Sequence, residues 1–513
     1  MTMPENNKKS IVSHFVPPFV MAILFAVLVG LVCRHGAQVS GWDSLCYLAF
    51  AQTGTALDLP LHHGIGYSVI LRFFFLFSKD IHCATASCAI TVAFLYALLL
   101  SASFRRLFGP IGFLGAGANL LNFAILENFG RTMSEALFIL LVAAGHIALL
   151  SYLRSKHYRT FFLSALALAG ACLTRYAGLA FVASATLLIC HGGRWSRQSF
   201  LKGMSHAAFC LLPLLLVMGW NHIARGTATN RVFLFHPPRL AEFSDAGAML
   251  GSWFCPDRIW ISFPGINWVL LIAAIVLLCT ACIRAFASDR FPVACWTFPI
   301  AVYALFLLAA FSFFDSNISY DRRMLSPVVF FVIGGLCLFA RRTSPAMKHV
   351  VVWLLVYLCV FGAWRVCKFT KDRFIHGSGY FGDAWNQSDL VKRLECEVSN
   401  RVVYSNVEMG FHARGVPDVR GIVCTRAASS WQAIAGWEKE YAQMLEALQG
   451  GGILGVVWLE SKEWCEEYVP LQQIVLDAGL ERLAEYPEGT IWGRSELKPE
   501  FTQFISGVAN PIL

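Results

Sequence analysis

The chain has 513 residues, of which 57% are hydrophobic and only 14% are charged. In soluble globular proteins roughly a quarter of all residues are charged. This composition therefore excludes an ordinary soluble protein and predicts a polytopic α-helical membrane protein. The formal net charge of +9 does not indicate a nucleic-acid partner, because the basic residues lie between apolar segments and not on one face. Such spacing is typical of membrane topology signals.

About eleven apolar runs follow one another along the chain. A helix needs about 17–25 apolar residues to cross a bilayer, although the runs on either side of Arg175 are short and could form one broken helix. The stretch 66–77 is shorter still, and we expect it to be a helix at the membrane interface. The first run has no cleavage site after it and is interpreted as a retained anchor. The predicted spans are 19–33, 81–104, 111–126, 133–153, 161–173, 177–190, 204–220, 268–286, 292–313, 324–339 and 349–366.

The charges of the connections support this order of spans. Cytoplasmic loops of membrane proteins are rich in Lys and Arg. If Lys8 and Lys9 are cytoplasmic, every second connection is basic, from Arg105-Arg106 to Arg341-Arg342. The opposite side receives the Asp43 segment and a long loop over 221–265. After an odd number of spans, the rest of the chain lies on the side of Asp43, outside the cytoplasm.

The composition changes after Cys367 to a normal charge density. We therefore predict two domains, a transmembrane domain over 1–367 and a soluble α/β domain over 368–513. Within the second domain the pattern predicts buried strands at 401–406 and 453–459 and helices at 431–448 and 471–480. An oxidising compartment would allow one pair of its cysteines to form a disulfide; these are Cys396, Cys424 and Cys465.

The unusual polar residues gather on the side of Asp43. Asp43 and Tyr47 are four residues apart and share a face if their segment is helical; the alternative is that Asp43 only caps that helix. His62-His63-Gly64-Ile65-Gly66-Tyr67 comes next. We interpret His63 and Tyr67 as parts of a substrate-contacting turn. A metal site there is a weaker alternative, since adjacent histidines on a regular helix cannot face one ion.

Three further motifs carry charge at helix ends. Glu135 follows Arg131 at the start of a span, where the helix dipole stabilises an anion; the alternative is a capping role. Arg175, followed by Tyr176, lies between two apolar runs, so its partner must be a carboxylate or a bound phosphate. Arg322 and Arg323 begin another span and predict an anion site, unless Arg322 pairs with Asp321. His236, in the long loop, is another candidate substrate-binding residue.

Together these motifs resemble the GT-C glycosyltransferases, in the bacterial branch related to protein mannosyltransferases and the lipid A aminoarabinose transferase. The resemblance runs in order from the first span to about residue 342 and rests on Asp43 with Tyr47, 63–67, 133–135, 174–178 and 322–327. The family's Pro-Pro-Gly-Tyr-Pro turn appears here without its prolines, as His63-Gly64-Ile65-Gly66-Tyr67-Ser68. No nucleotide-binding glycine motif is present, which argues against a soluble nucleotide donor.

The resemblance implies transfer of a sugar from a polyprenyl-phosphate donor to a protein, lipid or glycan acceptor, in the plasma membrane of a bacterium. Asp43 would be the general base. Glu135 would orient the acceptor, assist Asp43 or hold a divalent cation. Alternatives are a lipid-linked polysaccharide ligase or polymerase, and a transporter or flippase of lipid-linked sugars. The expected substrate-binding residues are Tyr47, His63, Tyr67, Arg131, Arg175, Tyr176, His236, Arg322 and Arg323.

The charge pattern generates a topology prediction. Alkaline phosphatase fused after the last residue should be active and a fluorescent protein fused there should be dark, because only an extracytoplasmic terminus gives this pair of results. Fusions in the basic connection at Arg105 should give the reverse pair and serve as the control. A bright C-terminal fluorescent fusion would mean that one span is miscounted, with the runs around Arg175 as the first suspects.

Overall fold

The computed structural model describes residues 5–39, 41–53, 64–229, 233, 235, 237, 240–255, 264–287, 291–314, 322–416, 418–426, 433–459 and 468–501. Its contacts divide the chain into two compact units. The first contains most of the chain up to Ile375. The second contains His376–Leu513 together with Gln38–Leu45. The division therefore falls slightly beyond the boundary at 367/368 that the sequence predicted.

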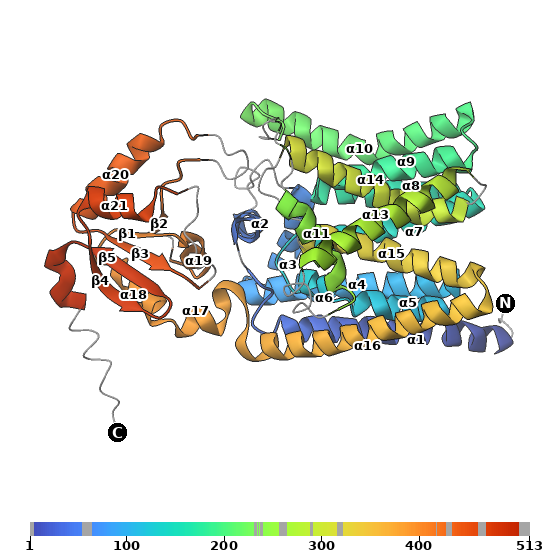
Figure 1. Cartoon of the computed structure of the whole chain (residues 1–513), viewed down its shortest axis with the longest axis horizontal. Coiled ribbons are helices and arrows are strands. Elements are labelled where there is room, and N and C mark those ends of the chain that lie inside the picture. Colours follow the sequence, from blue (N-terminus) through green and yellow to red (C-terminus); the bar gives the residue numbers. More distant parts are fainter. Residues whose placement is uncertain are drawn as a thin grey trace, which may run out of the picture. The chain divides into compact units, whose positions relative to one another are not determined.

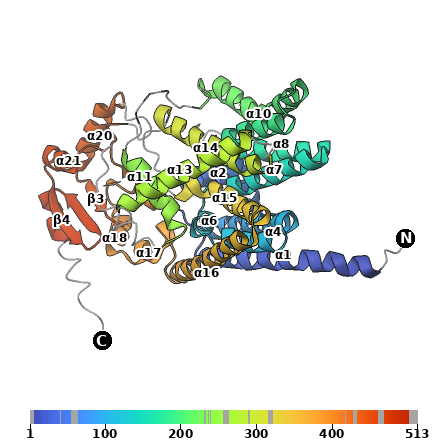
Figure 2. The ribbon, with the colours of Figure 1, turned by 45° about the vertical axis from the view of Figure 1, so that its right-hand side comes forward.

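The first unit is built from helices that run along one direction in Figure 1. α8, α10 and α14 lie on one side of this bundle and α1, α4 and α16 on the other, in both views (Figures 1 and 2). The long helices are α1 Glu5–Val32, α4 Ile81–Phe108, α7 Glu135–Ser155, α10 Arg197–Arg225, α13 Pro264–Ala287, α14 Phe291–Phe313, α15 Arg322–Arg342 and α16 Pro345–His376. Shorter ones are α2 Gly41–Thr53, α3 Ile65–Phe75, α5 Pro110–Leu120, α6 Phe123–Phe129, α8 Tyr158–Thr174, α9 Gly178–Gly192 and α11 Leu240–Ser252.

Each apolar run predicted as a span is helical over most of its length in the structure. Within the described residues, seven helices are long and apolar enough to cross a membrane, or eight if α5 and α6 count as one span. α8, α9 and the described apolar part of α1 are shorter. The class, a polytopic helical membrane protein with a small C-terminal sheet domain, is confirmed. The count of eleven spans is not.

The predicted span 111–126 is not one straight helix. α5 ends at Leu120 and α6 begins at Phe123, with a bend of 60° between them. The side chain of Asn122 accepts a hydrogen bond from the Ala124 backbone N–H at 3.0 Å and so caps the new helix. α16 comes so close that a Cβ on Gly362 would lie 2.4 Å from the carbonyl oxygen of Leu121. The bend therefore has a cap on one side and a packed backbone on the other.

The sequence predicted a long loop over 221–265, but part of this stretch is helical in the structure. α10 continues to Arg225, α13 already begins at Pro264, and α11 occupies Leu240–Ser252 between them. α11 packs on α13, which supplies the apolar neighbour that a short helix needs to be stable. A single sequence gives little signal for such a helix, because its stability depends on tertiary packing.

The second unit is an α/β domain with one five-stranded sheet in the order β2-β1-β3-β5-β4. β1 pairs in parallel with both β2 and β3, while β5 is antiparallel to its two neighbours. The strands are β1 Val403–Ser405, β2 Val419–Gly421, β3 Ile453–Val457, β4 Glu481–Tyr486 and β5 Gly489–Gly493. The helical elements are η2 Gly379–Phe381, α17 Asp383–Gln387, α18 Asp389–Glu397, α19 Glu408–Ala413, α20 Trp437–Gln449, α21 Leu471–Ala478 and η3 Ser495–Leu497.

Helices cover both faces of this sheet. Leu454 and Val456 of β3 pack with Met444 of α20 and Ile474 of α21. Gly455 faces the other way, and a Cβ there would come within 2.5 Å of a Leu394 methyl carbon on α18. This alternation is what a fully buried strand requires. The predicted strands correspond to β1 and β3. The predicted helix over 471–480 corresponds to α21, and the one over 431–448 begins later than predicted, at Trp437 of α20.

The cysteines of this domain differ in their surroundings. Cys396 is exposed and carries a free thiol. The Cys424 thiol lies 3.9 Å from the Ile422 carbonyl oxygen, and Cys465 lies outside the described residues. A disulfide among the three stays a prediction.

The second unit also holds the short segment that precedes α2. The Tyr380 backbone N–H in η2 donates a hydrogen bond to the Val39 carbonyl oxygen at 3.2 Å. Gly379 has a φ of +61°, and a Cβ on it would lie 2.3 Å from the same oxygen. A side chain at Gly379 would therefore be disfavoured both by the backbone conformation and by the lack of space. Because Asp43 lies in this Gln38–Leu45 segment, its backbone belongs to the second unit.

Candidate functional site

The site centres on the carboxylate of Glu135, in the first turn of α7. This side chain is 2% exposed. Its Oε1 lies 2.6 Å from Nη1 of Arg175 and 3.5 Å from Nε of Arg323. A buried carboxylate needs such partners because an unpaired charge in a low-dielectric interior is strongly disfavoured. Among these three side chains, two guanidiniums face one carboxylate.

A tight turn presents Arg175. α8 ends at Thr174, and Arg175 has an extended backbone, with φ −150° and ψ 138°. The Gly178 N–H then donates to the Arg175 carbonyl oxygen at 2.9 Å and closes the turn into α9. A Cβ on Gly178 would lie 2.6 Å from the backbone nitrogen of Cys172, so the close return of the chain needs glycine here. The runs on either side of Arg175 are thus two helices joined by a turn.

The second guanidinium comes from the start of α15. Arg323 lies in the first turn of this helix, and its Nη1 is 3.2 Å from the sulfur of Met133. The next residue, Met324, places its sulfur 3.5 Å from Nη2 of Arg175. The Met324 carbonyl oxygen in turn accepts a hydrogen bond from the Tyr303 hydroxyl at 2.8 Å. Each guanidinium therefore contacts a polarizable thioether sulfur, which is a weak acceptor, in addition to the Glu135 carboxylate.

Tyrosines from α2 and α3 join the cluster through Ser134. The Tyr47 hydroxyl donates to Ser134 Oγ at 3.2 Å, and Arg175 Nη1 donates to the same oxygen at 3.3 Å. The rings of Tyr47 and Tyr67 meet edge to face with centroids 5.1 Å apart, and both side chains are buried. These contacts tie the polar ends of α2, α7 and α8 together.

The turn before α3 packs directly on the end of α8. A Cβ on Gly64 would lie 2.3 Å from the Thr174 carbonyl oxygen, and one on Gly66 would lie 2.8 Å from Thr174 Oγ1. Neither position tolerates a side chain without movement of the backbone or of Thr174. The two glycines of the predicted turn are therefore explained by close approach to the residues that immediately precede Arg175.

The structure brings together five of the predicted site residues: Tyr47, Tyr67, Glu135, Arg175 and Arg323. It gives Arg131 a different environment, in which Nη2 forms an ion pair with Glu127 Oε1 at 2.7 Å, four residues earlier. Tyr176 is half-buried in the turn after Arg175.

The remaining predicted residues are described less fully. Asp43 is half-buried in the first turn of α2, one helical turn before Tyr47. Arg322 begins α15, but its side chain is outside the described part of the structure. His63 and His236 lie outside the described residues altogether.

Sequence reasoning missed the part played by Ser134. A serine before a helix that begins with Glu is typical of an N-cap. The structure has Ser134 at that position, yet its side chain makes no cap hydrogen bond. Its hydroxyl serves Tyr47 and Arg175 instead. The sequence signal was present, but it pointed to a local role and not to a contact between helices.

These residues do not form a recognisable metal site. Within the part of the chain that the structure describes, no group of three or more His, Cys, Asp or Glu side chains is placed to hold an ion. The Glu135 carboxylate is already engaged by two guanidiniums, and nearby cations disfavour another cation. The described residues thus do not fit the divalent cation that the sequence resemblance allowed.

Comparison with known proteins supports the fold. No protein-family model matches the chain, and no curated protein matches its sequence. The crystal structure of ArnT from Cupriavidus metallidurans in the apo state is similar to it, with a TM-score of 0.55 at 12% identity. The same enzyme bound to undecaprenyl phosphate gives a TM-score of 0.50 at 11% identity. In both cases the similarity covers 92% of this chain and 97% of the other. The predicted GT-C fold is thereby confirmed.

The buried cluster generates a stability prediction. Glu135→Gln should lower the stability of the purified protein by about 3–5 kcal/mol, the usual cost of breaking a buried ion pair, because it leaves two guanidiniums without their carboxylate. Glu485→Gln is the matched control, since its pair with Arg482, at 2.9 Å, joins two exposed side chains and should be worth about 1 kcal/mol or less. Thermal unfolding in detergent, followed by tryptophan fluorescence, measures both. Equal shifts of the two melting temperatures would contradict a central role for Glu135.

Proposed function

We propose that this chain is a membrane glycosyltransferase that moves a sugar from a polyprenyl-phosphate donor to an acceptor on the extracytoplasmic face. The observation that carries the proposal is the pair of guanidiniums, Arg175 and Arg323, held on the buried Glu135 carboxylate. The GT-C fold supports it, and so does the fact that ArnT, which has this fold, binds undecaprenyl phosphate.

The two arginines would bind the donor phosphate. Their side chains are 19% and 24% exposed, so each keeps part of its surface available while Glu135 fixes its orientation. Guanidinium groups match the oxygens of a phosphate and form strong charge-assisted hydrogen bonds with them. In this role Glu135 is a positioning residue, because its carboxylate contacts the arginines and is too deeply buried to contact an acceptor.

Asp43 would be the general base of the transfer. It would accept the proton of the acceptor hydroxyl while the hydroxyl oxygen attacks the anomeric carbon of the sugar. The bond between that carbon and the phosphate oxygen breaks, and polyprenyl phosphate leaves with its charge stabilised by Arg175 and Arg323. A single displacement of this kind inverts the anomeric carbon and forms no covalent enzyme intermediate. Tyr47, one turn away on α2, would help to position the acceptor or the sugar.

The side of the membrane follows from the charge of the connections. The basic loops mark the cytoplasm, so the Asp43 segment and the C-terminal α/β domain would lie outside it, in the plasma membrane of a bacterium. The donor's hydrocarbon chain would remain in the bilayer while its phosphate meets the arginines near the outer surface.

Asp43→Asn tests the catalytic assignment. The amide keeps the shape of the carboxylate but cannot accept a proton, so transfer from the polyprenyl-phosphate sugar should fall by about 10²-fold or more. Donor binding and expression should change little. Because Asn is as good a helix cap as Asp, near-normal transfer by a folded Asp43→Asn enzyme would leave Asp43 with a capping role only.

Donor binding is tested separately at the arginines. Arg175→Ala and Arg323→Ala should each weaken binding of undecaprenyl phosphate by about tenfold or more, since each removes a charge-assisted contact of about 1.5–3 kcal/mol. Arg175→Lys should restore only part of the affinity, because an ammonium lacks the planar fork. Arg131→Ala is the matched control and should bind normally. Unchanged binding in both alanine variants would restrict Arg175 and Arg323 to internal ion pairs.

A further inference from the structure

The connection between α1 and α2 determines where Asp43 is placed. α1 ends at Val32 and α2 begins at Gly41, so only 33–40 separate the two helices. Asp43 lies in the first turn of α2. Any contact that fixes 33–40 therefore also restricts the start of α2 and the carboxylate that it carries.

The end of α16 holds the first half of this connection. The Arg34 guanidinium lies over the Phe374 ring, 4.2 Å from its centroid. The Nε2–H of His35 donates to the carbonyl oxygen of the same phenylalanine at 3.2 Å. Because both the ring and the backbone of Phe374 are used, 34–35 and the last turn of α16 lie side by side.

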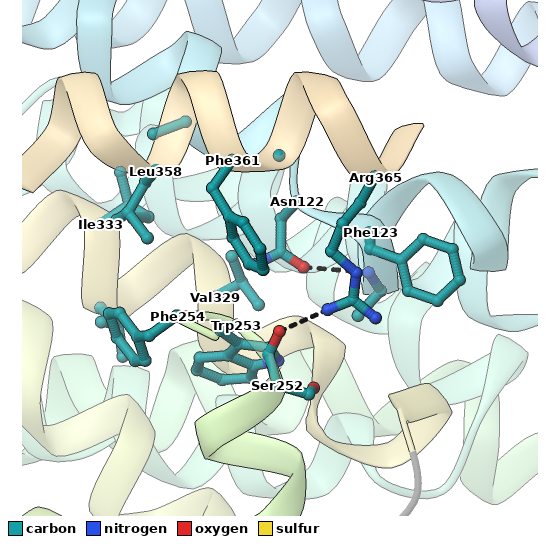
Figure 3. Close-up of a pocket in the computed structure, with 14 residues that line it drawn as sticks. Asn122, Phe123, Ser252, Trp253, Phe254, Val329, Ile333, Leu358, Phe361 and Arg365 are labelled. Atoms are coloured by element: carbon teal, nitrogen blue, oxygen red, sulfur yellow. Dashed lines mark hydrogen bonds between the residues drawn. The ribbon is translucent and has the colours of Figure 1, made fainter. Parts of the chain in front are cut away.

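α16 is itself anchored to the helical unit before it reaches Phe374. Figure 3 shows the Arg365 side chain reaching from α16 to a place between Asn122 and Ser252. Its Nη1 donates to the Ser252 carbonyl oxygen at the end of α11. Its guanidinium carbon lies 4.6 Å from the ring centroid of Phe123 in α6. The support of the connection is therefore tied to two further helices.

η2 holds the second half of the connection. Only Gly377 and Ser378 separate α16 from η2, and η2 belongs to the same compact unit as Gln38 and Val39. Besides the hydrogen bond from the Tyr380 N–H to the Val39 carbonyl oxygen, the packing is tight. A Cβ on the residue before Tyr380 would lie 2.3 Å from that oxygen and 3.2 Å from Gln38 Cγ. A side chain there would therefore push 38–39 away.

The α/β domain in turn anchors η2. The ring of Tyr380 meets that of Trp385 edge to face at 5.1 Å. Trp385 is 2% exposed, and its ring lies 5.8 Å from that of Phe411. Arg414 Nη1 donates to the Tyr380 carbonyl oxygen at 3.3 Å, and its Nε lies 2.6 Å from Glu395 Oε1. With partners in α17, α18 and α19, η2 is part of the packed body of this domain.

We propose that the C-terminal domain positions the general base through Gly379 and Tyr380. Both are positioning residues: they hold Val39, and Val39 restricts the start of the helix that carries Asp43. One turn further along α2, the Tyr47 hydroxyl is bonded to the serine before α7, so Asp43 lies between two fixed points. A general base needs such restriction, because a displacement of about 1 Å can lower a rate by about 10²-fold. This inference rests on the proposed function, in which Asp43 is the base.

Gly379→Ala tests the proposal in the full-length protein. Alanine is strained at a φ of +61°, and its Cβ would collide with the Val39 carbonyl oxygen. Turnover should therefore fall by about tenfold or more, while the affinity for undecaprenyl phosphate should stay unchanged. Gly479→Ala is the matched control, because Gly479 has a φ of +63° and nothing lies within 4 Å of its Cβ position. It carries the same backbone strain without the collision and should keep normal turnover.

Two measurements separate positioning of Asp43 from a general loss of structure. Added to Asp43→Asn, Gly379→Ala should cause little further loss of transfer, since both changes then act on the same group. Hydrogen–deuterium exchange needs no substrate. Peptides over 38–49 should exchange faster in Gly379→Ala than in the wild type or in Gly479→Ala, while peptides of α7 and α8 should not change.

Arg414→Gln covers the case that Gly379→Ala does not fold. It frees the Tyr380 carbonyl oxygen from its guanidinium partner and should change turnover and exchange in the same direction. Wild-type turnover and exchange in both variants would overturn the proposal, and so would a full additive loss in the double variant with Asp43→Asn. Wild-type turnover by Gly379→Ala beside an inactive Asp43→Asn would overturn this inference alone. Normal transfer by Asp43→Asn would instead remove the proposed base, and the positioning role with it.

Discussion

A carboxylate buried among membrane helices must be paired with cations, and this constraint organises the helical unit. Glu135 lies at the start of α7, while its partners come from the turn after α8 and from the first turn of α15. Each element is therefore fixed at its polar end by an ion pair, although most of its remaining surface is apolar and could slide against neighbours. In hydrocarbon, apolar packing alone discriminates poorly between registers, because lipid tails are as apolar as leucine. The ion pairs supply the missing specificity.

Around this carboxylate, Ser134 and Arg175 contact other helices and do not adopt the capping or helical role that their local sequence favours. Ser134 leaves the cap of α7 unfilled, and its hydroxyl serves Tyr47 and Arg175. Arg175 leaves the helical conformation altogether in order to reach Glu135. Such departures from local sequence preference are expected at functional sites, where the function of a residue can require a locally less stable conformation. The same region holds the residues that would bind the donor phosphate.

Much of this organisation could be predicted from the sequence, because hydrophobicity and charge act locally. The apolar runs predicted the helices, and the position of Arg175 between two of them predicted a carboxylate or phosphate partner. The sequence could not identify that partner as Glu135, since a pairing between α7 and α8 depends on how the helices pack. The bend at Asn122 and the helix α11 were missed for the same reason. Both depend on neighbours that are distant in the chain, such as Gly362 and α13.

The close contact between α3 and α8 has a thermodynamic consequence. Because Gly64 and Gly66 lie directly on the backbone of Thr174, α3 cannot move toward α8 without displacing the residue next to Arg175. A molecule that binds at α3 and shifts it would therefore change the affinity of Arg175 for an anion, and the anion would change the affinity of that molecule by the same factor. Two ligands on opposite sides of this contact would bind as a linked pair, even if they never touched.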